Sequence, residues 1–417
     1  MPTQAFESRI QKAIDEGIIP GAVILATSKD GILSPVPSSS ISFTNVDVVK
    51  GKLNYSTALG YSHLPPATPQ PIPMTLDTVF TLASMTKLLT GIAILQLVER
   101  GKITLETDVA EILPELSSQP ILTGFDTETG EPILTKRKNS ILLRHLLSHS
   151  SGTSYVFLDE NLKKYFEKTG KQLPMPLSPV GGKTVVGRFG YPLLFEPGEG
   201  WAYGSGMDWV GEIVRRVGGK GGLDEWVREE ILSKVGVERD RITFYPSSHV
   251  KVAGMGNRNE ETGKVEGYPG WGEGKSVEVF PGWGGGEEGG NTEEKMDEMG
   301  GEGAYADLRG YMKVMESLLR DDGKLLKSET VEMLFEGLLK EDKAKEGLKE
   351  SVRNPGWIVG WVPDNGGKYD WGVGGLVTTE DAEEGGKGRR KGFLQWGGVF
   401  NLAWVSIYTV DGWGRDG

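Results

Sequence analysis

Residues 86 to about 100 make up the most apolar helix that the sequence predicts, and this helix constrains the fold more than any other segment. A helix that is apolar on most sides must be buried on most sides, so other elements have to pack around it. Gly101 follows and is a typical residue for the end of a helix. The apolar side chains that surround the helix are Met85, Leu88, Leu89, Ile92, Ala93, Ile94, Leu95, Leu97 and Val98.

Predicted strands lie near both ends of the chain, and predicted helices lie between them. Near the N-terminus the apolar pattern predicts a helix over 3–16 and strands over 22–27 and 54–61. Near the C-terminus it predicts a helix over 308–319 and strands over 357–361, 369–377 and 392–409. Residues 103–232 are predicted as helix and loop, with the clearest helices in LLRHLLSH (142–149) and MDWVGEIVRRVGG (207–219). This order favours an α/β (α+β) sheet domain formed by residues 1–84 and 300–417, with a mainly helical domain, 85–299, inserted.

The composition excludes several classes of protein. A net charge of −12 argues against nucleic-acid binding, and the absence of cysteine excludes disulfides, thiolate metal sites and a cysteine nucleophile. No apolar run reaches the roughly 18–20 residues of a membrane span, and the N-terminus lacks a signal-peptide pattern, so we expect no membrane association and a cytoplasmic location. Glycine is frequent, and two acidic glycine-rich regions, 254–303 and 381–390, are predicted surface loops.

Ser84 and Lys87 form the first candidate catalytic pair. They lie three residues apart at the start of the apolar helix, and residues at that spacing share one helix face. The helix start also supplies free backbone N–H groups and a partial positive charge, which stabilise an oxyanion. A lysine in apolar surroundings gives up its proton more readily and can then accept one from a serine. Alone, the pair is explained as well by an N-capping serine and a lysine that reaches solvent.

Two further segments carry candidate functional residues. In FEPGEGWAYGSG (195–206) a Pro-Gly turn leads to Tyr203, which small residues flank, as in a loop that presents a phenol to a cleft. Ser205 in this segment also fits the N-cap of the following helix. In QWGGV (395–399) paired glycines on a predicted strand permit close approach of a ligand. The alternatives are a packed loop tyrosine and a strand bulge under a core tryptophan.

Together, the three motifs resemble the serine β-lactamase and penicillin-binding-protein superfamily in order and spacing. The segments 17–23 and 142–152 fit the same pattern, and the resemblance runs from about residue 20 to 404. The phrases YDWGVGGL (369–376) and WGG (396–398) are most similar to the class C-like esterases and the fungal transesterases of the lovastatin-pathway acyltransferase type. The resemblance implies a β-lactamase/transpeptidase-like fold, in which an antiparallel sheet is flanked by helices from both termini.

The resemblance also implies roles for single residues. Ser84 is the nucleophile, Lys87 is the general base or its electrostatic partner, and Tyr203 is the general acid and base. The backbone N–H groups of Ser84 and Val399 form the oxyanion hole. Ser205, Trp396, Gly397 and Gly398 contact the substrate, and no cofactor or metal is required.

The sequence departs from the family pattern at three places. Trp396 stands where β-lactamases and peptidases carry the lysine of Lys-Thr-Gly, which favours an apolar acyl group over a β-lactam. Ser205 replaces the asparagine of the usual Tyr-x-Asn motif. The family continues with further strand and a long helix after the third motif, so a chain that stops at Gly417 predicts a truncated or misread gene end.

We therefore predict a serine esterase or transesterase of secondary metabolism that acts through an acyl-enzyme on Ser84. The acyl donor is a small-molecule ester or thioester, with an acyl carrier protein as one candidate, and the acceptor is an alcohol or water. The alternatives are a β-lactamase or D-Ala-D-Ala peptidase-type hydrolase and a non-catalytic binding protein on the same fold.

Two other kinds of active site fit the sequence less well. A Ser-His-Asp hydrolase lacks its G-x-S-x-G motif here, and the chain has only four histidines. His145 and His149 have the spacing of helical zinc ligands, but Leu146 occupies the place of the glutamate in H-E-x-x-H. A structural histidine pair near a helix end is the better interpretation.

Overall fold

The structure is a computed structural model that describes residues 2–30, 45–46, 53–174, 181–247, 250–267, 296–353, 368–381, 389–399 and 402–407. The chain divides into two compact units. Unit 1 comprises Met1–Thr81, Val235–Lys295 and Tyr305–Asp322, and unit 2 comprises Leu82–Lys234, Met296–Ala304 and Gly323–Gly417. These limits differ from the domain limits expected from the sequence, which stay a prediction.

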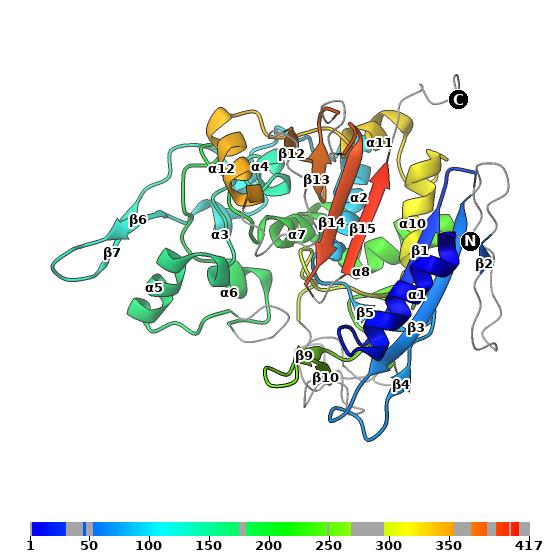
Figure 1. Ribbon diagram of the computed structural model, residues 1–417. Helices are drawn as coiled ribbons and strands as arrows, with labels where there is room; N and C mark the ends of the chain where they lie inside the picture. Colours follow the sequence, from blue (N-terminus) through cyan, green and yellow to red (C-terminus); the bar gives the residue numbers. More distant parts are fainter. Residues whose placement is uncertain are drawn as a thin grey trace. The chain divides into compact units, whose positions relative to one another are not determined.

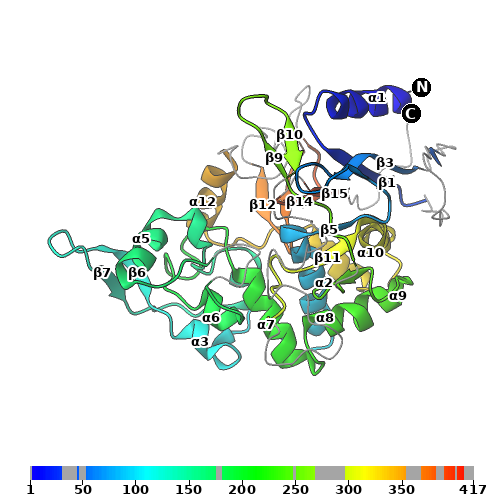
Figure 2. The ribbon, with the colours of Figure 1, turned by 90° about the horizontal axis from the view of Figure 1, so that it is seen from below.

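Unit 1 is built on an antiparallel sheet with the strand order β1-β3-β2, and β4 pairs with the far end of β3. Helix α1 lies against β3 and helix α10 against β1 (Figures 1 and 2). A second sheet has the order β5-β11-β8, and β9 and β10 form a hairpin. The elements are α1 (Pro2–Asp15), β1 (Gly21–Thr27), β2 (Asn45–Val46), β3 (Asn54–His63), β4 (Ile72–Pro73), β5 (Val79–Thr81), β8 (Ile242–Thr243), β9 (Gly256–Arg258), β10 (Val265–Gly267), β11 (Tyr305–Asp307) and α10 (Leu308–Arg320).

Unit 2 contains an antiparallel sheet with the order β12-β13-β14-β15 and most of the helices (Figure 1). The helices are η1 (Ala83–Met85), α2 (Thr86–Glu99), η2 (Val109–Glu111), α3 (Pro114–Ser117), α4 (Leu143–Leu147), η3 (Val156–Leu158), α5 (Glu160–Thr169), α6 (Val185–Phe189), α7 (Gly206–Gly218), α8 (Leu223–Trp226), η4 (Val227–Leu232), α11 (Ser328–Leu334) and α12 (Asp342–Arg353), with the short α9 (Ser233–Val235) at the boundary of the units. The strands are β6 (Ile121–Phe125), β7 (Pro132–Thr135), β12 (Tyr369–Trp371), β13 (Leu376–Thr378), β14 (Phe393–Gly398) and β15 (Leu402–Ile407).

Helix α2 is the centre of unit 2, as its sequence predicts. Every residue from Thr86 to Leu97 is buried. The helix packs against α7 and η4, so apolar side chains find partners on all sides. Its one amide side chain, Gln96, is fully bonded, because it donates to the carbonyl oxygens of Glu230 and Leu325 and accepts from the indole of Trp226.

The structure confirms several predicted elements and corrects others. The predicted elements over 3–16, 22–27, 54–61, 86–100 and 308–319 are confirmed within one or two residues. Residues 369–377 and 392–409 are each two strands of a hairpin, and in the first hairpin the chain turns at Gly374, whose φ is +86°. The hairpin of β6 and β7 was missed within the segment predicted as helix and loop. The strand predicted over 357–361 lies outside the described residues.

The acidic glycine-rich region 254–303 is not a continuous surface loop. Residues 256–267 carry the β9–β10 hairpin of unit 1. Residues 299–304 are buried in unit 2, where Thr90 donates to the carbonyl oxygen of Gly300 at 2.7 Å and Ala304 N–H donates to Thr86 Oγ1 at 3.1 Å. Residues 268–295 and 382–388, where the two glycine-rich loops were predicted, lie outside the described residues.

Candidate active site

Ser84 lies in η1, the single turn that precedes α2, and its side chain is half-buried. A hydrogen bond of 2.8 Å from Leu82 N–H to the carbonyl oxygen of Ala304 holds the backbone just before it. Ala83 has a φ of +46°, a left-handed conformation that is uncommon for a residue with a side chain. This tight turn places Ser84 at the N-terminal end of α2, where the first backbone N–H groups of a helix have no partner within it.

Lys87 lies in the first turn of α2 and has no exposed surface. Its Nζ donates to Ser84 Oγ at 3.1 Å, to the carbonyl oxygen of Gly301 at 2.8 Å and to Tyr155 Oη at 3.5 Å. The ammonium also lies 4.7 Å from the centre of the Tyr203 ring, within the range of a cation–π interaction. The alternative of a lysine that reaches solvent is therefore wrong.

Tyr203 precedes α7 and is only 8% exposed. Its hydroxyl donates to Ser84 Oγ at 2.8 Å and accepts a hydrogen bond from Trp396 Nε1 at 3.0 Å. The rings of Tyr203 and Trp396 also touch, with their centres 5.2 Å apart. Ser84 Oγ is thus within hydrogen-bonding distance of both an amine and a phenol, the two groups that the sequence predicted beside it.

The Trp396-Gly397-Gly398 motif ends β14, which lies beside η1. A Cβ at Gly398 would overlap the carbonyl oxygen of Leu82, so only glycine lets the strand approach the turn before Ser84 this closely. Trp396 donates to Tyr203, a contact that the prediction of substrate binding did not include. Val399 follows in a turn and is half-exposed, and its part in an oxyanion hole stays a prediction.

Ser205 is fully buried at the N-cap position of α7. Its carbonyl oxygen accepts from the N–H groups of Asp208 and Trp209 at 3.0 and 3.2 Å, while its hydroxyl forms no capping hydrogen bond. Ser205 therefore occupies the N-cap position of α7, as the alternative interpretation predicted, but its side chain does not cap the helix. Roles of Ser205 and Gly397 in substrate binding stay predictions.

Three residues that no motif pointed to surround Lys87. Asp208 accepts hydrogen bonds from Gly301 N–H at 2.9 Å and from Tyr155 Oη at 3.1 Å. Both of these residues contact Lys87 Nζ, so one carboxylate holds two of the lysine's partners. Burial, and next the charge of Glu302, raises the pKa of Asp208 to about 7. The only sequence signal was a carboxylate within the apolar stretch MDWV, because its partners lie 53 and 93 residues away.

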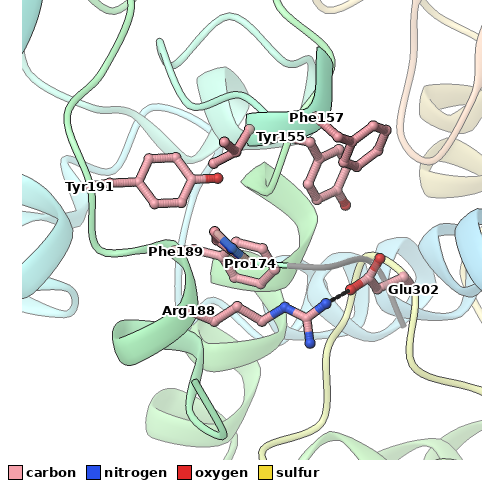
Figure 3. Close-up of a pocket in the computed structure, with 8 residues that line it drawn as sticks. Tyr155, Phe157, Pro174, Arg188, Phe189, Tyr191 and Glu302 are labelled. Carbon is pink, nitrogen blue, oxygen red and sulfur yellow. Dashed lines mark hydrogen bonds and ion pairs between the residues drawn. The ribbon is translucent and has the colours of Figure 1, made fainter. Parts of the chain in front are cut away.

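A small cavity borders this network (Figure 3), with room for about one water molecule. Within it, Arg188 and Glu302 form a buried ion pair at 2.8 Å, and the Phe157 ring stacks on the Tyr155 ring. Because Glu302 follows Gly301 directly, the ion pair anchors the segment that supplies a carbonyl oxygen to Lys87. The lining residues are Tyr155, Val156, Phe157, Pro174, Arg188, Phe189, Tyr191 and Glu302.

The histidine pair has separate surroundings. His145 Nδ1 accepts from Leu142 N–H at 3.2 Å, and burial lowers the pKa of His145 to about 4. Across the described ranges, no three histidine, aspartate or glutamate side chains gather as ligands for a metal ion. None of the helices in the part of the chain that the structure describes has both the length and the apolar character of a membrane span.

A serine at the start of a buried helix, bonded to a lysine one turn later and to a tyrosine from another loop, is the arrangement of a serine hydrolase or acyltransferase. The chain belongs to the beta-lactamase family, whose family model matches residues 7–411.

Named relatives and solved structures refine this assignment. The chain is 35% identical to a lovastatin esterase from Penicillium rubens over 96% of this chain and 88% of that protein. It is 31% identical to monacolin J acid methylbutanoyltransferase from Aspergillus terreus, over 97% and 87% of the two chains. A simvastatin synthase mutant from Aspergillus terreus is similar in structure, with a TM-score of 0.74 and 31% identity over 97% and 88% of the chains.

These comparisons confirm the family and the β-lactamase/transpeptidase-like fold that the motifs predicted. The chain is an enzyme of the serine hydrolase or acyltransferase type, related to acyltransferases and esterases. The alternative of a non-catalytic binding protein therefore loses its support.

Proposed function

We propose that this enzyme is a serine transesterase or esterase that carries its acyl group on Ser84 during turnover. One observation carries the proposal: Ser84 Oγ lies 3.1 Å from Lys87 Nζ and 2.8 Å from Tyr203 Oη, at the start of a buried helix. A hydroxyl becomes a useful nucleophile when a neighbouring group removes its proton, and both neighbours are within reach.

In the proposed reaction, Ser84 Oγ attacks the acyl carbonyl carbon while its proton passes to the neighbour that is unprotonated in the reactive state, either the free amine of Lys87 or the phenolate of Tyr203. The carbonyl oxygen becomes an oxyanion, which the backbone N–H groups of Ser84 and Val399 stabilise. The bond between the acyl carbon and the leaving group then breaks, Tyr203 gives a proton to the departing alcohol or thiol, and the acyl group stays on Ser84 as an ester. An alcohol or water repeats these steps in reverse and releases the new ester or the acid.

The relatives and Trp396 support a short, apolar acyl group. One relative is named for transfer of a methylbutanoyl group and another for cleavage of lovastatin. The indole N–H of Trp396 is bonded to Tyr203, so this residue offers the substrate an apolar ring rather than a cation. We therefore propose a branched short-chain ester or thioester as the donor, an acyl carrier protein as one thioester source, and a bulky alcohol as the acceptor. We also propose that the enzyme works in the cytoplasm, which localisation of a fluorescent fusion tests.

Intact mass spectrometry after addition of p-nitrophenyl butyrate tests the acyl-enzyme. The wild type is expected to gain one butyryl group, and Ser84→Ala is expected to gain none. Ser148→Ala is the matched control, because Ser148 is a fully buried serine of the same unit whose hydroxyl bonds to Arg144 and Ser150 of its own segment. A wild type that gains no mass while it still hydrolyses the ester would contradict the covalent mechanism.

Competition between acceptors separates the two activities. Addition of a bulky secondary alcohol diverts the acyl group into a new ester if the enzyme is a transesterase, and leaves only acid if it is an esterase. Rapid turnover of the β-lactam nitrocefin would instead favour the β-lactamase-type alternative and contradict the interpretation of Trp396.

A further inference from the structure

His149 contacts the ring of Tyr203 and both of its neighbours in the chain, Ala202 and Gly204. Its carbonyl oxygen accepts from Ala202 N–H at 3.0 Å, and its side-chain Nδ1 accepts from Gly204 N–H at 3.3 Å. Its ring centre lies 4.6 Å from that of Tyr203. The residues immediately before and after Tyr203 and the Tyr203 ring itself therefore all rest on one residue. The acid-base assignment of Tyr203 makes no use of His149, and neither the family resemblance of segment 142–152 nor the pairing of His149 with His145 gives it a role in the reaction.

The surroundings of His149 fix the protonation and the orientation of its ring. The residue has no exposed surface, and burial, followed by the charge of Lys87, lowers the pKa of His149 well below its usual value. The ring is therefore neutral at physiological pH. Because Nδ1 accepts the hydrogen bond from Gly204, the proton of the neutral ring resides on Nε2. The rings of Trp201 and Trp371 pack edge-on against the imidazole, with centres 6.0 and 4.8 Å away, and keep it from rotating.

The backbone at His149 is also unusual. Its φ of +59° is left-handed, a conformation that asparagine tolerates better than most residues with a side chain. The turn lets both the carbonyl oxygen and the side chain of one residue face the same loop. Gly204 has no space for a side chain, since a Cβ there would overlap the backbone of Ser154. The loop around Tyr203 is therefore fitted closely between His149 and Ser154.

We propose that His149 is a positioning residue for acyl transfer: its Nδ1 and carbonyl oxygen hold the loop on both sides of Tyr203, and thereby set the place of the Tyr203 hydroxyl beside Ser84. This inference rests on the proposed function, because it assumes that Tyr203 transfers protons. A hydroxyl displaced by about 1 Å would leave the 2.8 Å contact with Ser84 and slow the reaction by roughly 100-fold.

The test compares two amide substitutions of His149. In His149→Asn the amide oxygen falls near the place of Nδ1, so the hydrogen bond from Gly204 is kept. In His149→Gln the oxygen lies one carbon further out, and the bond is lost. We expect acylation by p-nitrophenyl butyrate to slow about 10- to 100-fold in His149→Gln and to recover most of its rate in His149→Asn. The matched control is the same pair of substitutions at His145, a buried histidine whose Nδ1 also caps a backbone N–H, and both are expected to leave the acylation rate near that of the wild type.

A double-mutant cycle with Tyr203→Phe separates positioning from a general structural effect. If His149 acts through Tyr203, His149→Gln costs little further rate once the hydroxyl of Tyr203 is absent. An equal loss in both backgrounds overturns the inference, and so does a rate for His149→Asn no better than that for His149→Gln. If Tyr203→Phe itself acylates at the wild-type rate, the proposed function of Tyr203 fails instead. Thermal unfolding shows which variants fold. If His149→Gln does not fold, the cycle is run with His149→Ala, which also removes the Nδ1 acceptor, and additive losses in that cycle overturn the inference.

Discussion

Gly301 supplies the carbonyl oxygen nearest to Lys87 Nζ, and a single added methyl group at this residue disturbs the whole network. A Cβ at Gly301 would lie 2.5 Å from Asp208 Oδ2 and 2.7 Å from Tyr155 Oη, whereas ordinary contact begins at 3.4 Å. Both oxygens would therefore have to move by about 0.7–0.9 Å, and they are bonded to each other at 3.1 Å. Gly301→Ala thus displaces two of the partners that hold Lys87.

The expected size of the effect follows from these overlaps. Overpacking of a buried site lowers the free energy of unfolding by about 1–3 kcal/mol, which urea unfolding measures. A shift of nearly 1 Å in the groups around Lys87 lowers the acylation rate by roughly 100-fold, which rapid-mixing mass spectrometry with p-nitrophenyl butyrate measures. The rate loss exceeds what partial unfolding alone produces, because a chain destabilised by this amount stays mostly folded.

Gly221→Ala is the control, since a Cβ at Gly221 would meet no atom within 4 Å. It is expected to keep both the stability and the rate of the wild type. The reasoning is refuted if Gly301→Ala folds and acylates within a few-fold of the wild-type rate, because the contacts of Gly301 would then not govern Lys87.

Three other outcomes are expected. Trp396→Phe removes the N–H donor to Tyr203 and lowers kcat/KM for ester hydrolysis by about 3- to 10-fold. Trp404→Phe, on the neighbouring strand, leaves kcat/KM unchanged. Equal losses in the two variants would contradict a specific role for the indole N–H. Arg188→Met removes the ion-pair partner of the buried Glu302 carboxylate and lowers the free energy of unfolding by about 3–5 kcal/mol in urea titrations. A change below about 1 kcal/mol would show that the pair does not anchor its segment. Burial lowers the pKa of His145 from 6.5 to about 4 in the folded chain, so the unfolded chain binds this proton first as pH falls, and the free energy of unfolding drops by about 3 kcal/mol between these two values. His145→Asn should lose this part of the pH dependence. An unchanged stability profile in the variant would argue against the pKa shift.

Local patterns predicted the elements and the central chemistry. The apolar stretch that became α2 could only be a buried helix, and Ser84 and Lys87 at its start could only share a face. The role of Tyr203 was predicted from the order of the three motifs along the chain. A single tyrosine in a loop would not have been enough to predict it. Predictions failed where they depended on short strands, because the hairpin of β6 and β7 has exposed apolar residues and no clear alternation.

Other parts of the site depend on contacts between residues far apart in the sequence. Asp208, Tyr155 and Gly301 carry no local pattern that distinguishes them from ordinary core or loop residues. The composition predicts a glycine-rich surface loop that includes most of the segment 299–304, yet this segment is buried against α2. Close packing, not flexibility, requires glycine at Gly300 and Gly301, and composition cannot separate these two reasons.

The sequence by itself predicted the family, the enzyme type and the three side chains that the structure brings together, because helix periodicity and motif order can be recognised without a folded structure. Tertiary structure alone decided how those groups are held: a carboxylate on α7 binds two partners of Lys87, Trp396 donates to Tyr203, and a buried histidine supports the loop on both sides of that tyrosine. Hydrogen bonds of about 3 Å require all their atoms to be placed at once, and only packing around α2 brings segments from residues 84 to 396 within that distance.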